Sequence, residues 1–388
     1  MSQSSDIERL RALSGIKWRR YGDDVIPAWV ADMDFPTAPA IIDALRTMVD
    51  ASDFGYNMNA YDDSIPKAWA EWSERRFGWR PDVSRTKVFS TSLQAIATAL
   101  TVGTSAGDGV LLFTPVYPPF FGMIEKSGRK LVEYHLDQAE WRIDEDLLRS
   151  AIEPGTRAMI LCNPHNPTGR VFDLDELRAI ATVAEECDLL VISDEIWQDF
   201  VYPGASHIPF ASLGTEAMAR CVTVTAASKS FSLGGLSCAV ANLGDARVAE
   251  GVAALPPHLL GGVNALGAHA TLAAWTHGEP WLTETVNVLR ANRDHLMSRL
   301  ASELPQIPVR MPEATYLAWL DFRSTGIAAT PAARLLKHGR VGLSSGPDFG
   351  AAGEGFARLN FATHPDLLDQ IVDRISLVCH STSQASGS

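Results

Sequence analysis

The chain has 388 residues, 46% of them hydrophobic and 20% charged, which is typical of a globular protein with a sizeable core. Its formal net charge of −13 argues against nucleic acid or an anionic membrane as the main partner, because both attract basic surfaces. The sequence has no run of 18 apolar residues and starts without an apolar leader segment, so we expect neither membrane insertion nor export.

Cysteine usage indicates a reducing compartment. The cysteines are odd in number, dispersed, mostly inside apolar runs, and without the spacing of metal ligands. They are Cys162, Cys187, Cys221, Cys238 and Cys379. We therefore expect reduced, buried thiols in a cytoplasmic protein, and no metal site.

Short apolar runs in the middle of the chain predict buried strands. They span residues 87–90, 110–113, 158–162, 189–193 and 221–225. Between the third and the fourth, residues 173–187 predict a helix, with Asp173 and Glu176 spaced as a capping box. The order strand, helix, strand implies parallel strands joined by right-handed crossovers, so we expect an α/β fold.

The two ends of the chain differ from this middle part. Residues 1–48 form an arm that contains Trp and Pro, and a long helical pattern at 281–304 leads into a mixed α+β segment. We expect the arm to join a small α+β domain over 282–380, beside a large α/β domain over 49–281. The low-complexity tail at 381–388 is expected to be disordered.

Polar motifs follow three of the predicted strands, at the point where each strand ends. They are Asn163-Pro-His-Asn-Pro-Thr-Gly169, Asp194 and Ser228-Lys229. Each has a simpler interpretation: Asn166 as a turn residue before Pro, Asp194 as a helix N-cap, and Lys229 as a surface lysine. The carboxyl ends of the strands are where an open parallel sheet binds ligands, so three motifs at that edge favour a ligand site.

Lys229 stands apart from the other lysines. The chain has seven lysines and 26 arginines, and six of the lysines sit among charged, polar or turn residues, as solvated lysines do. Those six are Lys17, Lys67, Lys87, Lys126, Lys130 and Lys337. Lys229 instead lies in a small, hydroxyl-rich segment with no acid nearby in sequence. Partial desolvation there would favour the neutral amine that imine formation requires.

These motifs resemble the fold-type I pyridoxal-5′-phosphate (PLP) enzymes of the class I/II aminotransferase superfamily. Within it, they resemble the MalY/PatB-type cysteine-conjugate β-lyases. N-P-x-N-P-T-G with D-E-I and S-K is typical of the superfamily, and W-V-A-D-M-D-F with P-V-Y-P-P-F is typical of the lyases. The matching segments are Trp29–Phe35, Phe54–Tyr56, Thr114–Phe120, Leu161–Arg170, Asp194–Ile196, Ala314–Asp321 and Arg358–Ala362. The resemblance implies an aspartate-aminotransferase-like fold, with a mainly parallel central sheet flanked by helices and a smaller α+β domain.

The resemblance also implies roles around the cofactor ring. Lys229 resembles the Schiff-base lysine, which becomes the base at Cα once substrate releases it. Asp194 resembles the partner of the pyridine nitrogen, and Asn166 the donor to the phenolic oxygen. Tyr117 resembles the aromatic residue that stacks on the ring, and Trp197 is expected near the phenolic oxygen or at the substrate entrance. We expect Lys229, Asp194 and Tyr117 to take part in catalysis.

Other residues match the phosphate and substrate sites of the family. Thr91, Ser92 and Leu93 begin a helix after the strand at 87–90 and match the phosphate cup, to which Ser228 adds a hydroxyl. Tyr56 resembles the tyrosine that reaches the phosphate of the neighbouring subunit, which implies a homodimer with shared active sites. In the substrate site, the resemblance places Arg358 on the α-carboxylate, with Asp34, Tyr316 and Asn166 as further contacts.

The sequence departs from the family pattern near the lysine. Ser237 stands where aminotransferases often carry a phosphate-binding arginine, and Trp197 stands where a His or Tyr is usual. The segment Ser230–Leu236 also differs from the usual T-F-N-x-A-G-L. These departures leave PLP binding intact and raise the question of whether cystathionine is the substrate. Trp197 also has a simpler interpretation, as a core residue beneath the sheet edge.

The activity that the resemblance implies is α,β-elimination from an L-cysteine S-conjugate, including a bulky biosynthetic one, to give a thiol, pyruvate and ammonia. Transamination is the first alternative, because it shares every step up to the loss of the Cα proton. Decarboxylation coupled to oxidative deamination of an S-conjugated cysteine is a second. A catalytically idle PLP-binding regulator, of the kind fused to a DNA-binding domain, is disfavoured, since no basic helix-turn-helix precedes residue 17 and the catalytic residues are present.

Overall fold

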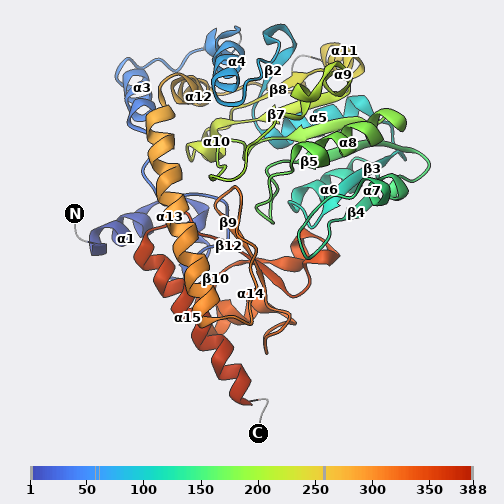
Figure 1. Ribbon diagram of the computed structural model, residues 1–388. Helices are drawn as coiled ribbons and strands as arrows, with labels where there is room; N and C mark the ends of the chain where they lie inside the picture. The colour runs from blue at the N-terminus through green and yellow to red at the C-terminus, as the bar shows by residue number, and fades with distance from the viewer. Residues whose placement is uncertain (1–2, 57, 61, 257–258, 386–388) are drawn as a thin grey trace. The chain divides into compact units, whose positions relative to one another are not determined.

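The computed structural model describes residues 3–56, 58–60, 62–256 and 259–385 (Figure 1). They divide into two units. The first unit contains the described residues up to Pro36, together with Pro167–Gly169 and the chain from Val286 onward. The second unit contains Thr37–Asn166 and Arg170–Thr285.

A seven-stranded sheet forms the core of the second unit, in the order β2-β8-β7-β6-β5-β3-β4. Its strands are β2 (Thr86–Phe89), β3 (Gly109–Thr114), β4 (Lys130–His135), β5 (Thr156–Cys162), β6 (Leu190–Asp194), β7 (Cys221–Thr225) and β8 (Ala239–Leu243). Every neighbouring pair from β4 to β7 is parallel, whereas β8 runs antiparallel to both β7 and β2. The predicted α/β fold with a mainly parallel sheet is confirmed.

All five predicted strands are present. Four of them, β3, β5, β6 and β7, are apolar runs that are almost entirely buried, whereas β2 lies at the edge of the sheet with Lys87 exposed. Two further strands, β4 and β8, were missed. The edge strand β4 has three exposed residues among its six and so lacks an apolar run. In β8 the run of small residues is broken by Asn242, whose buried amide donates to Asp82 O (3.0 Å) and Thr86 Oγ1 (3.1 Å).

The second unit contains the following helices, most of which cover its sheet (Figure 1). They are α3 (Pro39–Asp50), α4 (Ser64–Phe77), α5 (Ser92–Gly103), α6 (Pro119–Lys126), α7 (Glu145–Ala151), α8 (Leu174–Glu186), α9 (Thr215–Ala219), α10 (Ala227–Ser230), α11 (Ala246–Ala254) and α12 (Ala265–His277). The helix predicted at 173–187 is α8. Its capping box is present, because Asp173 accepts the Glu176 N–H (2.9 Å) and Glu176 accepts the Asp173 N–H (3.0 Å).

The first unit contains a small antiparallel sheet in the order β11-β12-β9 and a two-stranded parallel pair, β1 with β10. Its elements are α1 (Gln3–Ala12), α2 (Ile16–Arg19), β1 (Ile26–Pro27), β9 (Leu317–Asp321), α14 (Pro331–Arg334), a π-helix (Leu335–Gly339), β10 (Val341–Gly342), β11 (Ser344–Ser345), β12 (Phe356–Asn360) and α15 (Pro365–Ala385). The long helix α13 (Glu279–Glu303) begins in the second unit and continues into the first. In the first unit Arg299 of α13 binds Asp369 (2.9 Å) and Asp373 (2.7 Å) of α15.

The observed division differs in detail from the expected domains. The arm expected over 1–48 contributes only its first 36 residues to the first unit, because α3 packs against α12 of the second. Residues 167–169 also fall in the first unit, where Gly169 O accepts the N–H groups of Glu313 and Ala314 (both 2.9 Å). The tail expected to be disordered from 381 is helical as far as Ala385, since no Gly or Pro interrupts α15 before that point. Residues 386–388 lie outside the described residues.

Lys17 corrects the interpretation of the lysines. The other five lysines expected to be solvated are exposed, but Lys17 keeps only 3% of its surface exposed. Its Nζ binds Asp34 Oδ2 (2.8 Å) and Asp32 O (3.0 Å), and Trp18 Nε1 donates to Asp34 Oδ1 (2.7 Å). The partner is 17 residues away in sequence, so the local surroundings of Lys17 gave no sign of it.

Among the described residues, no helix is both long enough and apolar enough to cross a membrane.

Lys17→Met should lower the free energy of unfolding by about 3–5 kcal/mol, because it leaves the buried Asp34 carboxylate without its cation. The double variant Lys17→Met/Asp34→Asn should lose less, since the amide removes the buried charge and still accepts from Trp18. Urea unfolding of the purified proteins measures both. Lys67→Met, in which an exposed lysine is replaced, is the control and should lie within about 0.5 kcal/mol of wild type. An equally small change in Lys17→Met would contradict the buried pair.

Candidate active site

Asp194 is the last residue of β6 and keeps 4% of its surface exposed. Among the described residues, its carboxylate accepts one hydrogen bond, from the Ile196 N–H to Oδ1 (3.2 Å). Burial raises the pKa of this carboxyl from 3.8 to about 7, although the Ile196 N–H and the charge of Lys229 act in the opposite direction. A buried carboxylate with so few donors is suited to a cationic ligand.

Lys229 lies in α10, the single helical turn that follows β7. Because β6 and β7 are parallel neighbours, their carboxyl ends meet at one edge of the sheet. Lys229 interacts electrostatically with Asp194, and its Nζ lies 5.8 Å from the centre of the Trp197 ring. The structure therefore brings Asp194, Lys229 and Trp197 together, as the motifs predicted.

Asn166 ends the loop that follows β5, the other neighbour of β6. The loop is fixed at both ends: Asn163 N–H donates to Asp194 O (3.0 Å), and the Asn166 N–H bonds to the sulfur of Cys162. Asn163 Oδ1 also accepts the Phe172 N–H (3.0 Å). Asn166 is buried, and its loop is joined to the end of β6 by the Asn163–Asp194 bond, so its amide belongs to the edge that carries Asp194.

Tyr117 follows β3, the next strand along the same edge, and is half-buried. Its ring packs edge-to-face on Phe120 at 5.6 Å between centres. This packing fixes the direction of the aromatic plane at the edge where β5 and β6 also end.

The N-terminus of α5 lies at the same edge, because Phe89 of β2 pairs with Ala239 and Thr225 of β7 pairs with Val240. Thr91 is the N-cap, and its hydroxyl accepts the Gln94 N–H (3.0 Å). Within the described residues, the backbone N–H groups of Ser92 and Leu93 donate to no acceptor. These groups and the helix dipole favour an anion, and the half-buried Ser228 follows β7 at this edge.

Tyr56 is not brought to these residues within one chain. It lies between α3 and a short 3₁₀ helix (Met58–Ala60), with its side chain 99% exposed. Phe54 and Met58 beside it are also exposed. Three large apolar or aromatic side chains in five residues thus face solvent in the monomer.

The residues expected to bind substrate, other than Asn166, belong to the first unit. Arg358 of β12 is buried, and its Nη2 donates to Trp29 O (2.9 Å) and Ser344 Oγ (3.2 Å). Its guanidinium lies 4.9 Å from the centre of the Phe349 ring. Asn360 of the same strand donates to Val30 O and Asp32 O (both 2.7 Å), so β12 holds the segment 29–32 in place.

Asp34 is less suited to bind substrate than the sequence suggests. Both carboxylate oxygens of Asp34 are engaged, one by Lys17 and one by Trp18, so the carboxylate anchors the N-terminal segment. Tyr316 is buried, and its carbonyl accepts the Phe361 N–H (3.0 Å). The expected substrate contact of Asp34 is therefore not favoured by this geometry.

Sequence reasoning missed Asp199 and the Glu195–His207 pair. Asp199 is a buried carboxylate joined to the lysine-bearing turn through Ser230 (2.6 Å). Glu195 is also buried and accepts from Ser193 Oγ (2.8 Å), with His207 Nε2 3.1 Å away. The available signal was the position of Asp199 among Ile196, Trp197 and Phe200, since an acid among large apolar residues indicates a buried carboxylate.

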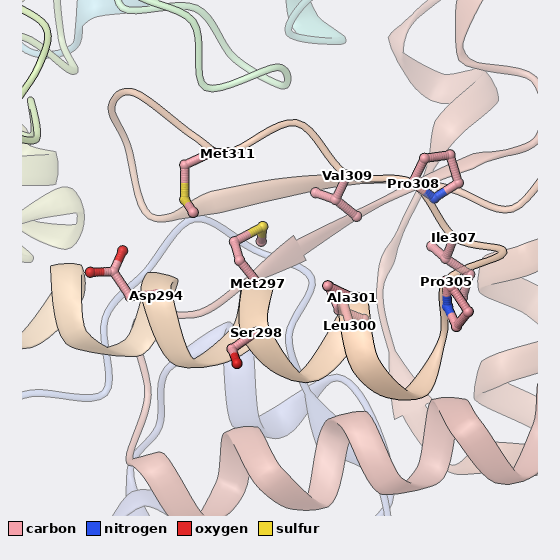
Figure 2. Close-up of a pocket in the computed structure, with 10 residues that line it drawn as sticks. All are labelled: Asp294, Met297, Ser298, Leu300, Ala301, Pro305, Ile307, Pro308, Val309 and Met311. Atoms are coloured by element: carbon pink, nitrogen blue, oxygen red, sulfur yellow. The ribbon is translucent and has the colours of Figure 1, made fainter.

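A groove in the first unit lies between α13 and the segment 305–311 (Figure 2). Its lining is mainly apolar, with Met297 and Met311 facing each other across it. None of the predicted site residues lines this groove. It therefore has no part in the chemistry considered below.

The donors at the sheet edge fit PLP. Asp194 offers a buried carboxyl to a ring nitrogen, and Lys229 offers an amine to the aldehyde. Asn166 offers an amide to the phenolic oxygen, and the first turn of α5 offers N–H groups to the phosphate. A carboxylate against the ring nitrogen favours its protonated form, so the ring would give the buried Asp194 carboxylate a cationic partner.

Comparisons with known proteins agree with this site. The sequence matches the family "aminotransferase class I and II" over residues 29–375. Cystathionine beta-lyase PatB of Bacillus subtilis (strain 168) is 37% identical over 363 residues, which cover 91% of this chain and 93% of PatB. A putative PLP-dependent β-cystathionase from Corynebacterium diphtheriae superposes with a TM-score of 0.91 at 32% identity, covering 96% of this chain and 98% of that one. The structure of OvoB superposes with a TM-score of 0.90 at 36% identity, covering 96% and 97%.

The fold and the residues at its sheet edge define a PLP-dependent enzyme. The chain belongs to the class I and II aminotransferase superfamily and, within it, to the PatB/MalY-type C–S lyases. The family, fold and cofactor that the motifs implied are thereby confirmed.

Asp194→Asn should stabilise the cofactor-free protein at high pH. Because the pKa of Asp194 is raised from 3.8 to about 7, the wild-type protein loses stability from this group as the pH rises from about 4 through about 7. The amide has no such penalty, so above pH 8 the variant should be the more stable by up to about 4 kcal/mol. Urea unfolding at pH 5 and pH 8.5 measures the difference.

The same comparison with saturating PLP provides the control. Wild type should then gain more stability than Asp194→Asn, because only the carboxylate pairs with the protonated ring nitrogen. A cofactor-free variant whose stability follows that of wild type at both pH values would show that Asp194 carries no burial penalty.

Proposed function

We propose that this enzyme cleaves the C–S bond of an L-cysteine S-conjugate by α,β-elimination, releasing a thiol, pyruvate and ammonia. The observation that carries the proposal is the approach of Lys229 to Asp194 at the sheet edge, with Nζ 5.8 Å from the centre of the Trp197 ring. The relation to PatB, which is named a cystathionine beta-lyase, favours elimination over the other outcomes.

PLP, when bound, supplies a ring that takes up the electron pair left at Cα. Asp194 keeps the ring nitrogen protonated, and Asn166 donates to the phenolic oxygen. Lys229 removes the Cα proton and is the base for every proton transfer at that carbon. The C–S electron pair then leaves with sulfur as a thiolate, and hydrolysis of what remains gives pyruvate and ammonia.

Arg358 is proposed to hold the substrate α-carboxylate. Its guanidinium is kept in one orientation by Trp29 O, Ser344 Oγ and the Phe349 ring. A fixed planar donor suits two-pronged binding of a carboxylate. We assign no substrate contact to Asp34, because Lys17 and Trp18 occupy its carboxylate.

We further propose a cytoplasmic homodimer with shared active sites. Tyr56, Phe54 and Met58 are exposed in the monomer, and a two-fold partner would cover them and receive Tyr56 at its phosphate site. All five cysteines are unpaired, in keeping with a reducing compartment.

The reaction type is tested by the products. Purified holoenzyme is incubated with cystathionine, S-methylcysteine and an S-aryl cysteine, and pyruvate, free thiol and ammonia are quantified. Elimination predicts equal amounts of the three products. Transamination instead predicts a keto acid that retains sulfur and no free thiol, and oxidative decarboxylation predicts carbon dioxide. Lys229→Ala is the control and should lose about 10⁴-fold or more in rate.

Trp197 is proposed to set the substrate range. Its ring is buried, lies beside Lys229 Nζ and packs on Phe200 at 6.1 Å between centres. An indole donates through one N–H and does not titrate, so it shapes the pocket rather than acting as a base. Trp197→Phe and Trp197→His should change the ratio of kcat/KM for cystathionine and for a bulkier conjugate by about tenfold, with PLP still bound.

Phe200→Leu is the matched control for Trp197, because it removes aromatic surface from the same cluster. It should lower thermal stability and affect all substrates alike. Equal losses for all substrates in Trp197→Phe, in step with its melting temperature, would show that Trp197 is only a core residue.

A further inference from the structure

The helix that carries Lys229 is too short to orient the side chain by itself. The helix α10 has four residues, and its N-cap, Ala226, makes no side-chain capping bond. An isolated helical turn is unstable, because nucleation fixes several residues for one hydrogen bond. The direction of Lys229 therefore depends on contacts made by its neighbours in the chain.

Both residues that follow Lys229 are anchored in the core of the second unit. Ser230 is fully buried, and its hydroxyl donates to Asp199 Oδ2 at 2.6 Å. Phe231 is also fully buried, and its ring lies edge-to-face with Trp72 (6.0 Å) and stacked on Trp281 (5.7 Å). The Ser230–Asp199 hydrogen bond restrains the rotation of α10, and the contacts of Phe231 with Trp72 and Trp281 hold this turn against the core.

Asp199 is itself held rigidly from the opposite side. Its Oδ1 accepts from Trp72 Nε1 (3.1 Å) and lies 3.0 Å from Arg76 Nε, and both partners belong to α4. Arg76 Nη2 also donates to the Asp199 carbonyl (3.4 Å). A buried carboxylate that contacts a guanidinium and accepts from neutral donors is compensated within the protein and keeps one geometry.

Asp194, at the end of β6, and Asp199, five residues later, are both buried carboxylates, but they differ in their hydrogen-bond partners. In the described part of the chain, the Asp194 carboxylate accepts one hydrogen bond, from the Ile196 N–H, so it has capacity for a further donor. Asp199 has Trp72, Arg76 and Ser230 as partners within the protein. The Asp199 carboxylate is thus engaged within the protein, and it links α4 to Ser230, the residue next to Lys229.

We propose that Asp199 is a positioning residue for Lys229, acting through the hydroxyl of Ser230. The Asp199–Ser230 bond holds α10 so that the Lys229 amine meets the cofactor aldehyde and the substrate Cα. This inference rests on Lys229 as the cofactor lysine in the proposed function, but not on which product the reaction gives.

The test separates binding of the cofactor from its capture by the lysine. The variants are Ser230→Ala, Ser230→Thr and Asp199→Asn, each prepared free of cofactor. Pyridoxamine 5′-phosphate binds without bonding to lysine, so its dissociation constant reports the state of the site. The rate at which PLP becomes fixed to Lys229 by borohydride, measured on the peptide that contains Lys229, reports the position of the amine.

Ser230→Ala should keep its affinity for pyridoxamine phosphate within about threefold and capture PLP about 10- to 100-fold more slowly, with kcat lowered and KM little changed. Asp199→Asn should show the same separation. Ser230→Thr, which keeps the hydroxyl, should restore capture to near the wild-type rate. Ser193→Ala is the matched control, because it removes another buried serine–carboxylate bond (Ser193 to Glu195, 2.8 Å) without touching α10.

Two outcomes overturn the proposal. Wild-type capture in Ser230→Ala would show that the bond does not position the lysine. Parallel loss of pyridoxamine phosphate affinity, capture and melting temperature, matched by Ser193→Ala or not rescued by threonine, would show that Asp199 and Ser230 only stabilise the fold. Because capture involves no substrate, a failure of the elimination assay would leave this result unchanged.

Discussion

Burial of the Asp194 carboxylate is the constraint on which the active site depends. At the end of β6 this group is buried and, within the residues that the structure describes, accepts one backbone hydrogen bond, so its pKa is raised to about 7. In the proposed assignment, a protonated ring nitrogen would offset that penalty and would favour the form of the cofactor that withdraws electrons best. The burial of Asp194 would then contribute both to the affinity for the cofactor and to its chemistry.

The cofactor site follows from the strand order. Because β3, β5, β6 and β7 are parallel neighbours, Tyr117, Asn166, Asp194 and Lys229 lie at one edge. The antiparallel β8 does not break this arrangement, since it connects β7 to β2 and brings the start of α5 to that edge. Each residue is thus placed by a strand that is buried on both faces, which gives the precision that a chemical site needs.

The sequence predicted those parts of the structure that a local pattern determines. Continuous apolar runs indicated five strands, and the polar residues after them indicated Asp194, Asn166 and Lys229. Properties that depend on distant partners could not be predicted. Lys17 looks solvated until Asp34 is seen beside it, and Asp199 looks like an ordinary acid until Trp72, 127 residues earlier in the chain, is found to donate to it. The edge strand β4 was missed because exposure on one face removes the apolar run.

The candidate cofactor residues and the proposed substrate residue belong to different units. The candidate cofactor residues Asp194, Lys229, Asn166 and Tyr117 belong to the second unit, and Arg358 with the segment it holds belongs to the first. Each group is fixed by contacts within its own unit: Arg358 by Trp29 O and Ser344, and Lys229 through Ser230 and Asp199. Under the proposed assignment, a substitution beside Arg358 changes contacts of the first unit and not the contacts that hold Lys229 in the second. Trp197, whose ring centre lies 5.8 Å from Lys229 Nζ, is the proposed determinant of substrate range within the second unit, because a change there alters the surroundings of the lysine itself.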